Sequence, residues 1–183
     1  GIMAVSLPAA DSRAVLAFPG AQGFGAHTSG GRGGKILRVI TLNSQGPGSF
    51  VEALQAKGPR IIVFEVGGII DLGGKSVKIA EPFLTVAGQT APAPGITFIK
   101  GEMIIQTHDV IIQHIAARPG EAGRAKKSGW EADAVSTTGA FNVIVDHCSF
   151  TWATDENLSA SGPRFDGNTV EDWRRNTSHD VTF

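Results

Sequence analysis

The feature of this sequence that most constrains its fold is a short β-branched run that recurs along the chain. Three of the runs begin with a turn-forming residue, at Asp109, Asn142 and Asp180. The runs are RIIVFEV from 60, FLTVAG from 83, DVIIQHI from 109, NVIVDHCSF from 142 and DVTF from 180. β-branched residues favour strands, and the glycine, proline and polar residues between the runs are typical of turns. The chain is therefore predicted to be all-β.

The intervals between the runs favour a parallel β-helix, in which each coil adds one strand to a stack. Ile62 to Val86 is 24 positions and Val86 to Ile112 is 26, and both match one coil of a β-solenoid. Ile112 to Ile144 is 32 positions and Ile144 to Val181 is 37, which fits coils that carry an insertion. An antiparallel sandwich also uses many short strands, but no hairpin turn of the Asn-Gly type separates these runs.

Two polar, glycine-containing segments are the predicted insertions. They are RPGEAGRAKKSGW at 118–130 and GPRFDGNTVEDWRRN at 162–176, and both are expected to bulge from the stack as surface loops.

One short N-terminal helix is expected, and it should cap one end of the core. Ser49 as the N-cap, Glu52 three residues later and Gly58 at the end form a capping box with a glycine stop. The apolar face of this helix consists of Phe50, Ala53 and Leu54.

Composition and charge set the remaining limits on the class of protein. Sixteen basic and seventeen acidic side chains leave a formal charge of −1, so no overall field favours nucleic acid or an anionic membrane as a partner. No apolar run approaches the ~18 residues that cross a bilayer. Residues 1–16 lack the basic start and long apolar stretch of an intact signal peptide, so we assign them to a leader remnant or cloning scar. Residues 17–183 are assigned to a single β-helix domain.

The glycine-rich segment 19–35 is predicted to be backbone-dominated coil. It does not match a phosphate-binding loop, because Ser29 and Ile36 stand where that motif requires glycine and Ser or Thr.

Three carboxylates are candidates for a cation site. Asp133 and Asp155 are 22 positions apart, close to one coil, so Asp155 should stack on Asp133. Neighbouring strands lie ~4.8 Å apart, which suits two carboxylates that share a hard cation such as Ca²⁺. Glu131, two residues before Asp133, would share its face. Ordinary solvated acids on loop edges would also explain this spacing.

Other chemically suggestive residues have structural interpretations. Asp146 and His147 are adjacent in a strand, so they should face opposite sides and not touch, and His147 is expected in an interior or turn hydrogen bond. Cys148 is predicted to be a small buried apolar residue, and as a single cysteine it forms no internal disulfide. Trp130 and Trp152 could stack on sugar rings, although core packing or loop anchoring explains them as well. The histidines without metal-ligand spacing are His27, His108, His114 and His179.

Five ordered blocks of this sequence resemble polysaccharide lyase family 1, the pectate lyases. They are AFPGAQGFGAHTSGGRGGK at 17–35, GPGSFVEAL at 46–54, GPRIIVFEVGGIIDL at 58–72, LTVAGQTAPAPGITF at 84–98 and NVIVDHCSFTWATDEN at 142–157. The resemblance implies a right-handed parallel β-helix, secretion to the extracellular space or periplasm, Ca²⁺ as the cofactor, and β-elimination of polygalacturonate. The implied partner is an acidic polysaccharide.

The resemblance also suggests roles for individual residues. Asp133 corresponds to the calcium-binding aspartate before the VxIDH strand, Glu131 to its acidic companion, and Asp155 to the acid after that strand. Many pectate lyases have a further calcium-binding aspartate where this chain has Ser159. The family's catalytic base is an arginine on a later coil, so the base is expected beyond Phe183. No family motif assigns that role to Arg164, Arg174 or Arg175.

Two other functions and one structural expectation remain open from the sequence. A carbohydrate-binding or structural β-helix without catalysis would need no base. A β-helical glycoside hydrolase would need an acid pair without a cation between them. Because an open coil edge leaves strand groups unpaired, further chain or a separate C-terminal fragment is expected to complete the β-helix.

Overall fold

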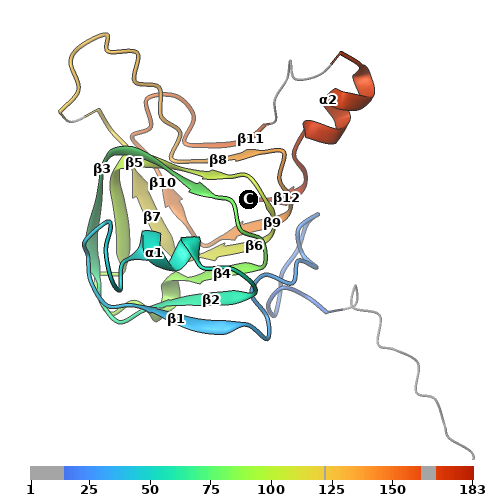
Figure 1. Ribbon diagram of the computed structural model, residues 1–183, viewed down its shortest axis with the longest axis horizontal. Helices are drawn as coiled ribbons and strands as arrows, with labels where there is room; N and C mark the ends of the chain where they lie inside the picture. Colours follow the sequence, from blue (N-terminus) through green and yellow to red (C-terminus); the bar gives the residue numbers. More distant parts are fainter. Residues whose placement is uncertain (1–14, 122, 162–167) are drawn as a thin grey trace, which may run out of the picture.

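The computed structural model describes residues 15–121, 123–161 and 168–183, so most of the predicted leader lies outside the described residues. The described chain winds into a right-handed parallel β-helix, seen end-on in Figure 1. Each described strand pair is parallel. The solenoid prediction is confirmed, and the antiparallel sandwich is excluded.

One face of the coil is a six-stranded sheet in the order β1-β2-β4-β6-β9-β12. Its strands are β1 (Lys35–Val39), β2 (Arg60–Phe64), β4 (Leu84–Ala87), β6 (His108–Gln113), β9 (Phe141–Asp146) and β12 (His179–Thr182). All five predicted runs lie in this sheet. Strand β1 was not predicted, because its side chains are mostly exposed and therefore carry little apolar signal.

The register of this sheet confirms the first two coil lengths and corrects the next two. Ile62 pairs with Val86, and Val86 pairs with Ile112, as the 24- and 26-residue intervals predict. Ile112 then pairs with Val145 instead of Ile144, because the third coil is one residue longer than we inferred. The fourth is longer by one residue as well, since Ile144 pairs with Thr182.

Two further faces close the coil. Strands β3 (Gly68–Ile79) and β5 (Ile96–Ile105) are long and continue around a corner, so each contributes to both faces. The first half of β5 pairs with β7 (Ile115–Arg118), which pairs with β10 (Ser149–Phe150), and its second half pairs with β8 (Val135–Thr138), which pairs with β11 (Leu158–Ser161). The short 3₁₀ helix η2 (Gly88–Thr90) follows β4. Sequences such as IAAR, VSTT and LSAS are small and polar, which explains why these strands were not predicted.

A column of left-handed residues leads into the six-stranded sheet. Asp109, Asn142 and Asp180 have φ of 54°, 52° and 51°, and Phe83 has φ of 60° in the corresponding position. Asp and Asn tolerate this conformation better than other residues with a Cβ atom. The turn-forming residues at the start of three predicted runs are therefore a real structural repeat.

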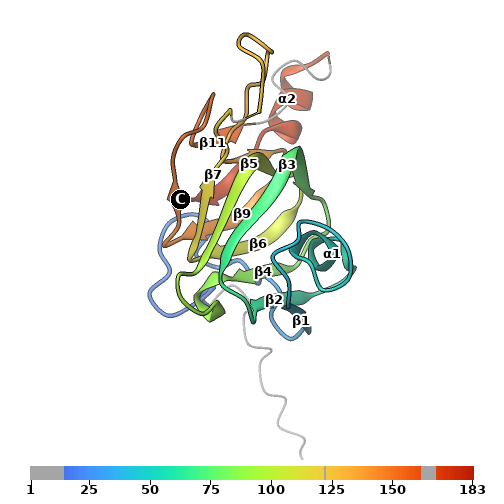
Figure 2. The same cartoon turned by 90° about the vertical axis from the view of Figure 1, so that its left-hand side faces the viewer.

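The helix α1 (Phe50–Gln55) covers one open end of the β-helix, as predicted, but it ends before the extended Ala56, so Gly58 is not its stop. Figure 2 shows it at that end, beside β2. The Ser49 hydroxyl accepts a hydrogen bond from the Glu52 amide at 3.2 Å, and the Glu52 carboxylate accepts one from the Gly48 amide at 2.6 Å. Phe50 is fully buried, with its ring centroid 4.6 Å from that of Phe98 in β5.

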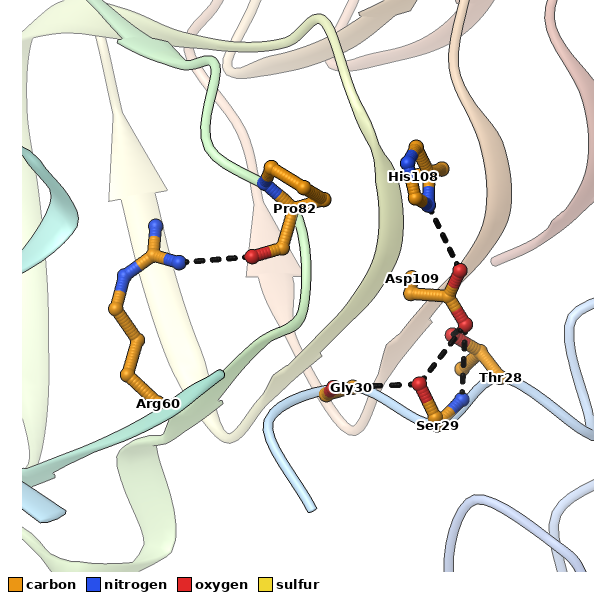
Figure 3. Close-up of polar contacts among 7 residues, drawn as sticks. All are labelled: Thr28, Ser29, Gly30, Arg60, Pro82, His108 and Asp109. Atoms are coloured by element: carbon orange, nitrogen blue, oxygen red, sulfur yellow. Dashed lines mark hydrogen bonds and ion pairs between the residues drawn. The ribbon is translucent and has the colours of Figure 1, made fainter. Parts of the chain in front are cut away.

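A buried arginine links α1 to the neighbouring coil through hydrogen bonds. Arg60 is 1% exposed, and its guanidinium donates to five backbone carbonyls, one of which, at Pro82, is drawn in Figure 3. The acceptors are the carbonyls of Ala53, Leu54, Gly58, Glu81 and Pro82. Burial lowers the pKa of Arg60, and these carbonyl dipoles replace the water that the cation has lost.

The glycine-rich segment, here called the glycine strap (residues 17–34), crosses the outer side of the six-stranded sheet. Asp109 in β6 accepts hydrogen bonds from the amide and the hydroxyl of Ser29 at 3.1 and 3.0 Å (Figure 3). Further along, the Gly25 amide donates to the Thr182 hydroxyl in β12 at 2.8 Å. The strap therefore joins coils that are far apart in the sequence.

Close approach explains why glycine is needed in the strap. A Cβ atom on Gly31 would lie 1.8 Å from the Arg60 carbonyl oxygen, and one on Gly25 would lie 2.2 Å from that of Val143. The Gly31 amide also donates to the Thr85 hydroxyl at 2.9 Å. The strap is coil, as predicted, but its glycines are needed because the backbone of the strap lies directly against the backbone of the sheet.

The two predicted insertions differ in structure. No helix or strand is described between Arg118 and Val135, which agrees with the predicted surface loop. The second segment is not entirely a loop, because it contains helix α2 (Val170–Asn176), while 162–167 lie outside the described residues. Thr169 and Asp172 form a capping box that starts this helix, which was not predicted from the sequence.

Candidate functional site

Three carboxylates gather at one corner of the β-helix. Asp133 lies just before β8, and Asp155 and Glu156 lie just before β11. Each offers one oxygen atom, and these three atoms all lie within 4.8 Å of one another. We call these residues the acidic group. Oxygen-only donors at this spacing are typical ligands of a hard cation such as Ca²⁺.

The strand register brings the acidic group together. Val135 in β8 pairs with Leu158 in β11, an offset of 23 residues. Just before these strands the ladder is irregular, because the Ala134 amide donates to the Glu156 carbonyl at 3.1 Å and the Thr154 amide donates to the Ala132 carbonyl at 3.2 Å. Asp133 therefore lies beside the stretch 154–156, which brings both Asp155 and Glu156 within reach of it.

Asp133 is the most tightly held member of the acidic group. One carboxylate oxygen accepts a hydrogen bond from the Ser159 hydroxyl at 2.7 Å, and the other accepts from the Glu156 amide at 3.1 Å. The Asp133 amide donates to Glu102 at 3.3 Å, and Glu102 accepts from the Ser76 hydroxyl at 2.6 Å. Ser76, Glu102, Asp133 and Ser159 thus form a polar row that crosses successive coils.

Like charges make the acidic group unfavourable without a counterion. Repulsion from Asp155, and then from Asp133, raises the pKa of Glu156. Asp155 and Glu156 are exposed, whereas Asp133 is half-buried. A cation from solvent can therefore reach the group and would relieve the repulsion.

The structure does not bring Glu131 into the acidic group. This residue is exposed and belongs to the loop before β8, where side chains do not alternate as they do in a strand. Its role as a ligand remains a prediction that the resemblance alone supports. Glu156 was missed because a spacing of one coil points only to Asp155, although Glu156 is its direct neighbour in the sequence.

The prediction that Asp146 and His147 cannot touch is wrong. The His147 ring nitrogen Nδ1 lies 2.7 Å from the Asp146 carboxylate, because β9 ends at Asp146 and His147 is left-handed, with φ of 51°. Burial opposes ionisation of Asp146, but hydrogen bonds from Gln113 and His147 outweigh it and lower its pKa. The expected turn hydrogen bond of His147 is present, which supports a structural role.

Cys148 is not activated as a nucleophile. Burial raises the pKa of its thiol to about 11, and the side chain packs against the edge of the core. A thiol with this pKa stays protonated at neutral pH.

The two tryptophans near the acidic group behave differently. Trp130 anchors its loop, since its indole nitrogen donates to the Gly120 carbonyl at 3.1 Å and Arg124 lies 3.9 Å above its ring. Trp152 is 75% exposed, so it is not a core residue. Of the three candidate arginines, Arg174 is exposed on α2, Arg164 lies outside the described residues, and so does the side chain of Arg175.

No family model matches the chain, but individual relatives do. A protein of Aspergillus terreus named "Probable pectate lyase C" is 41% identical over 150 residues, which is 81% of this chain and 34% of that protein. A protein of the same name in Aspergillus flavus is 40% identical, over the same fractions of both chains. The similarity to pectate lyases therefore extends over 81% of this chain. The chain spans about a third of the length of these relatives.

A solved structure supports the fold. The crystal structure of Jun a 1, the major allergen from cedar pollen, matches with a TM-score of 0.61 and 20% identity over 74% of this chain and 43% of that chain. The family resemblance inferred from the five sequence blocks is therefore confirmed, and so is the pectate lyase fold that it implies. In the described part of the chain, no helix has the length and apolar character needed to cross a membrane.

Proposed function

We propose that this chain is part of a pectate lyase that cleaves polygalacturonate, or a related uronate polysaccharide, by calcium-assisted β-elimination. The observation that carries the proposal is the acidic group, three carboxylate oxygens within 4.8 Å of one another, in a chain similar to pectate lyases. The group is exposed on a corner of the coil, where an extended polymer has access.

The residues present fit a calcium ion. Asp133, Asp155 and Glu156 offer only oxygen atoms, and a cation would relieve the repulsion from Asp155 and Asp133 that raises the pKa of Glu156. The Ser159 hydroxyl lies beside them and could offer a further neutral oxygen. When bound there, Ca²⁺ would neutralise a substrate carboxylate and make the C5 proton of that sugar more acidic.

The protein's own residues would orient this site. The hydrogen bonds from Ser159 and from the Glu156 amide fix both oxygens of the Asp133 carboxylate. The exposed Asp155 and Glu156 keep freedom to adjust to an ion and a polymer. β-Elimination also requires a base, and we propose that an arginine in the rest of the protein provides it. The substrate polymer is too large to cross a membrane, so the enzyme would act outside the cytoplasm.

A non-catalytic carbohydrate-binding protein is the second candidate. It is favoured by Ser159, which stands where many family members have a carboxylate. Within the described residues, no basic side chain contacts the acidic group through an ion pair.

One assay separates these functions. The full-length protein is incubated with polygalacturonate, with calcium or with a chelator, and ultraviolet absorbance of the unsaturated product is followed. We expect absorbance that depends on calcium and is lost in Asp133→Ala. New reducing ends without absorbance would indicate hydrolysis, and binding without any product would indicate the second candidate.

A further inference from the structure

A basic pocket lies close to the acidic group. Its lining includes Lys75, Lys100 and Arg124, together with Asp71 and the glycine pair 73–74. We propose that this basic pocket binds a carboxylate of the same acidic polysaccharide, at a different sugar from the one held at the acidic group. This inference rests on the proposed function, because it assumes a uronate polymer as the ligand.

An irregularity in the sheet forms the pocket. The pairing of β3 with β5 shifts between Asp71 and Lys75, and Lys100, opposite the shift, is left-handed with φ of 53°. The loop that follows β7 adds Arg124 from the next coil. In Figures 1 and 2 this loop rises above the part of the coil formed by β3 and β5.

The charge of the pocket suits an anion. Three cationic side chains face one carboxylate, so three positive charges minus one negative charge leave +2. Lys100 forms an ion pair with Asp71 at 2.7 Å, and both side chains remain 40–45% exposed. A ligand carboxylate can therefore approach Lys100 without breaking this ion pair, because an ammonium group has three donors.

Arg124 is held in place before any ligand binds. Its guanidinium donates to the Gly74 carbonyl and lies over the Trp130 ring, which is itself tied to Gly120. Arginine has five donors in a planar fork, so donors remain for a carboxylate. A side chain that is already ordered loses less entropy on binding.

The polar row gives the position of the basic pocket relative to the acidic group. Ser76 follows Lys75, Glu102 is two residues after Lys100, and Glu102 accepts a hydrogen bond from the Asp133 amide. The basic pocket is thus one to two coils before the acidic group on the same corner, roughly 5–10 Å at ~4.8 Å per coil. A linear polymer along the axis would meet both sites with different sugars.

Binding of galacturonate oligomers tests the pocket directly. Calorimetry with a dimer and a hexamer is run on the full-length protein, once with calcium and once with a chelator. We expect Lys75→Ala and the double variant Lys100→Ala/Arg124→Ala to weaken hexamer binding by about tenfold in both conditions. Dimer binding in calcium should not change, because a dimer can be held at the acidic group alone.

Controls separate the pocket from general effects of charge and folding. Lys35→Ala removes an exposed lysine from β1 and should leave hexamer binding unchanged. Lys75 is exposed, so its replacement tests the pocket even if the double variant disturbs the loop. Thermal unfolding of each variant checks the fold.

The outcomes distinguish failure of the pocket from failure of the proposed function. If the wild-type protein cleaves polygalacturonate but both pocket variants bind the hexamer normally, the subsite is wrong and the lyase remains. If the wild type neither binds nor cleaves polygalacturonate, the proposed function is wrong. Tighter binding of a sulfated oligomer of equal length would overturn the assignment of the pocket to uronates.

Discussion

The Ser159 hydroxyl donates a hydrogen bond to the Asp133 carboxylate, with 2.7 Å between the two oxygen atoms. Ser159 is the position at which this chain departs from the calcium-binding pattern of many pectate lyases. The hydrogen bond shows that the position lies beside the acidic group, although its side chain carries no charge. Serine therefore orients Asp133 here instead of adding a further carboxylate.

Replacing this serine with aspartate should strengthen calcium binding. Ser159→Asp adds a negative charge beside Asp133, and calcium affinity rises with the number of charged ligands. Without calcium the same variant should be less stable, since like charges are then closer together. Calorimetric titration with calcium measures the first effect and thermal unfolding in a chelator the second. A calcium affinity equal to that of wild type would mean that Ser159 does not face the ion.

Glu156 and Glu131 form a matched pair for testing the composition of the site. Glu156→Gln should weaken calcium binding by about tenfold or more, because it removes one of three charged ligands. Glu131→Gln removes the same charge from the same corner, outside the acidic group, and should have little effect. Titration of both variants with calcium distinguishes them, and a larger loss for Glu131 would contradict the structural grouping.

Asp109 should stabilise the protein in a manner that depends on pH. Burial raises the pKa of Asp109, but hydrogen bonds from His108 and Ser29 lower it by a larger amount, so the net shift is downward. The stabilisation is therefore present above the unfolded-state pKa of about 3.9 and is lost as the pH falls through the lower folded-state pKa. Asp109→Asn should cost about 2 kcal/mol at pH 7, with a smaller difference from wild type in strong acid.

Asp180 provides the control for this measurement. It occupies the same left-handed column and pairs with its neighbouring histidine, but half of its side chain is exposed. Asp180→Asn should change the free energy of unfolding by less than about 1 kcal/mol. Urea unfolding at several pH values compares the two variants, and equal losses would show that the contact with the strap contributes nothing.

Of two glycines in the strap, Gly31 should tolerate substitution by alanine less well than Gly33. A Cβ atom there would overlap the Arg60 carbonyl, so Gly31→Ala should cost about 2–3 kcal/mol through displacement of the strap. Gly33 has φ of +75° and open space around it, so Gly33→Ala should cost only about 1 kcal/mol of backbone strain. Denaturant unfolding ranks the two, and the reverse order would contradict the close packing of the strap.

Arg60 should matter for stability far more than an exposed arginine. Arg60→Met leaves buried carbonyls of α1 and the following coils without donors, which should cost about 3 kcal/mol or more. Arg38 forms an exposed ion pair with Glu65, so Arg38→Met should cost less than about 1 kcal/mol. Thermal or urea unfolding measures both, and similar losses would rule out the proposed role of the buried guanidinium.

The sequence predicted one face of the fold well and the others poorly. The five β-branched runs all belong to the six-stranded sheet, where their central side chains are buried in the core. Strands such as β8 and β11 consist mainly of Ser, Thr and Ala, and pairing with neighbouring coils determines their conformation. Helix α2 was missed because its capping box lies in a segment that composition alone assigned to a loop.

The sequence by itself determined the period of the solenoid, the capping helix, and two carboxylates of the acidic group, because these depend on residue type and local spacing. Only the tertiary structure decided which residues face one another. The stacking of β11 on β8 brought Glu156 into the acidic group, and the left-handed backbone of His147 brought its ring to Asp146. The number of residues in each corner of a coil depends on packing between coils, which the local sequence does not specify. The basic pocket likewise exists only because three coils are stacked at one corner.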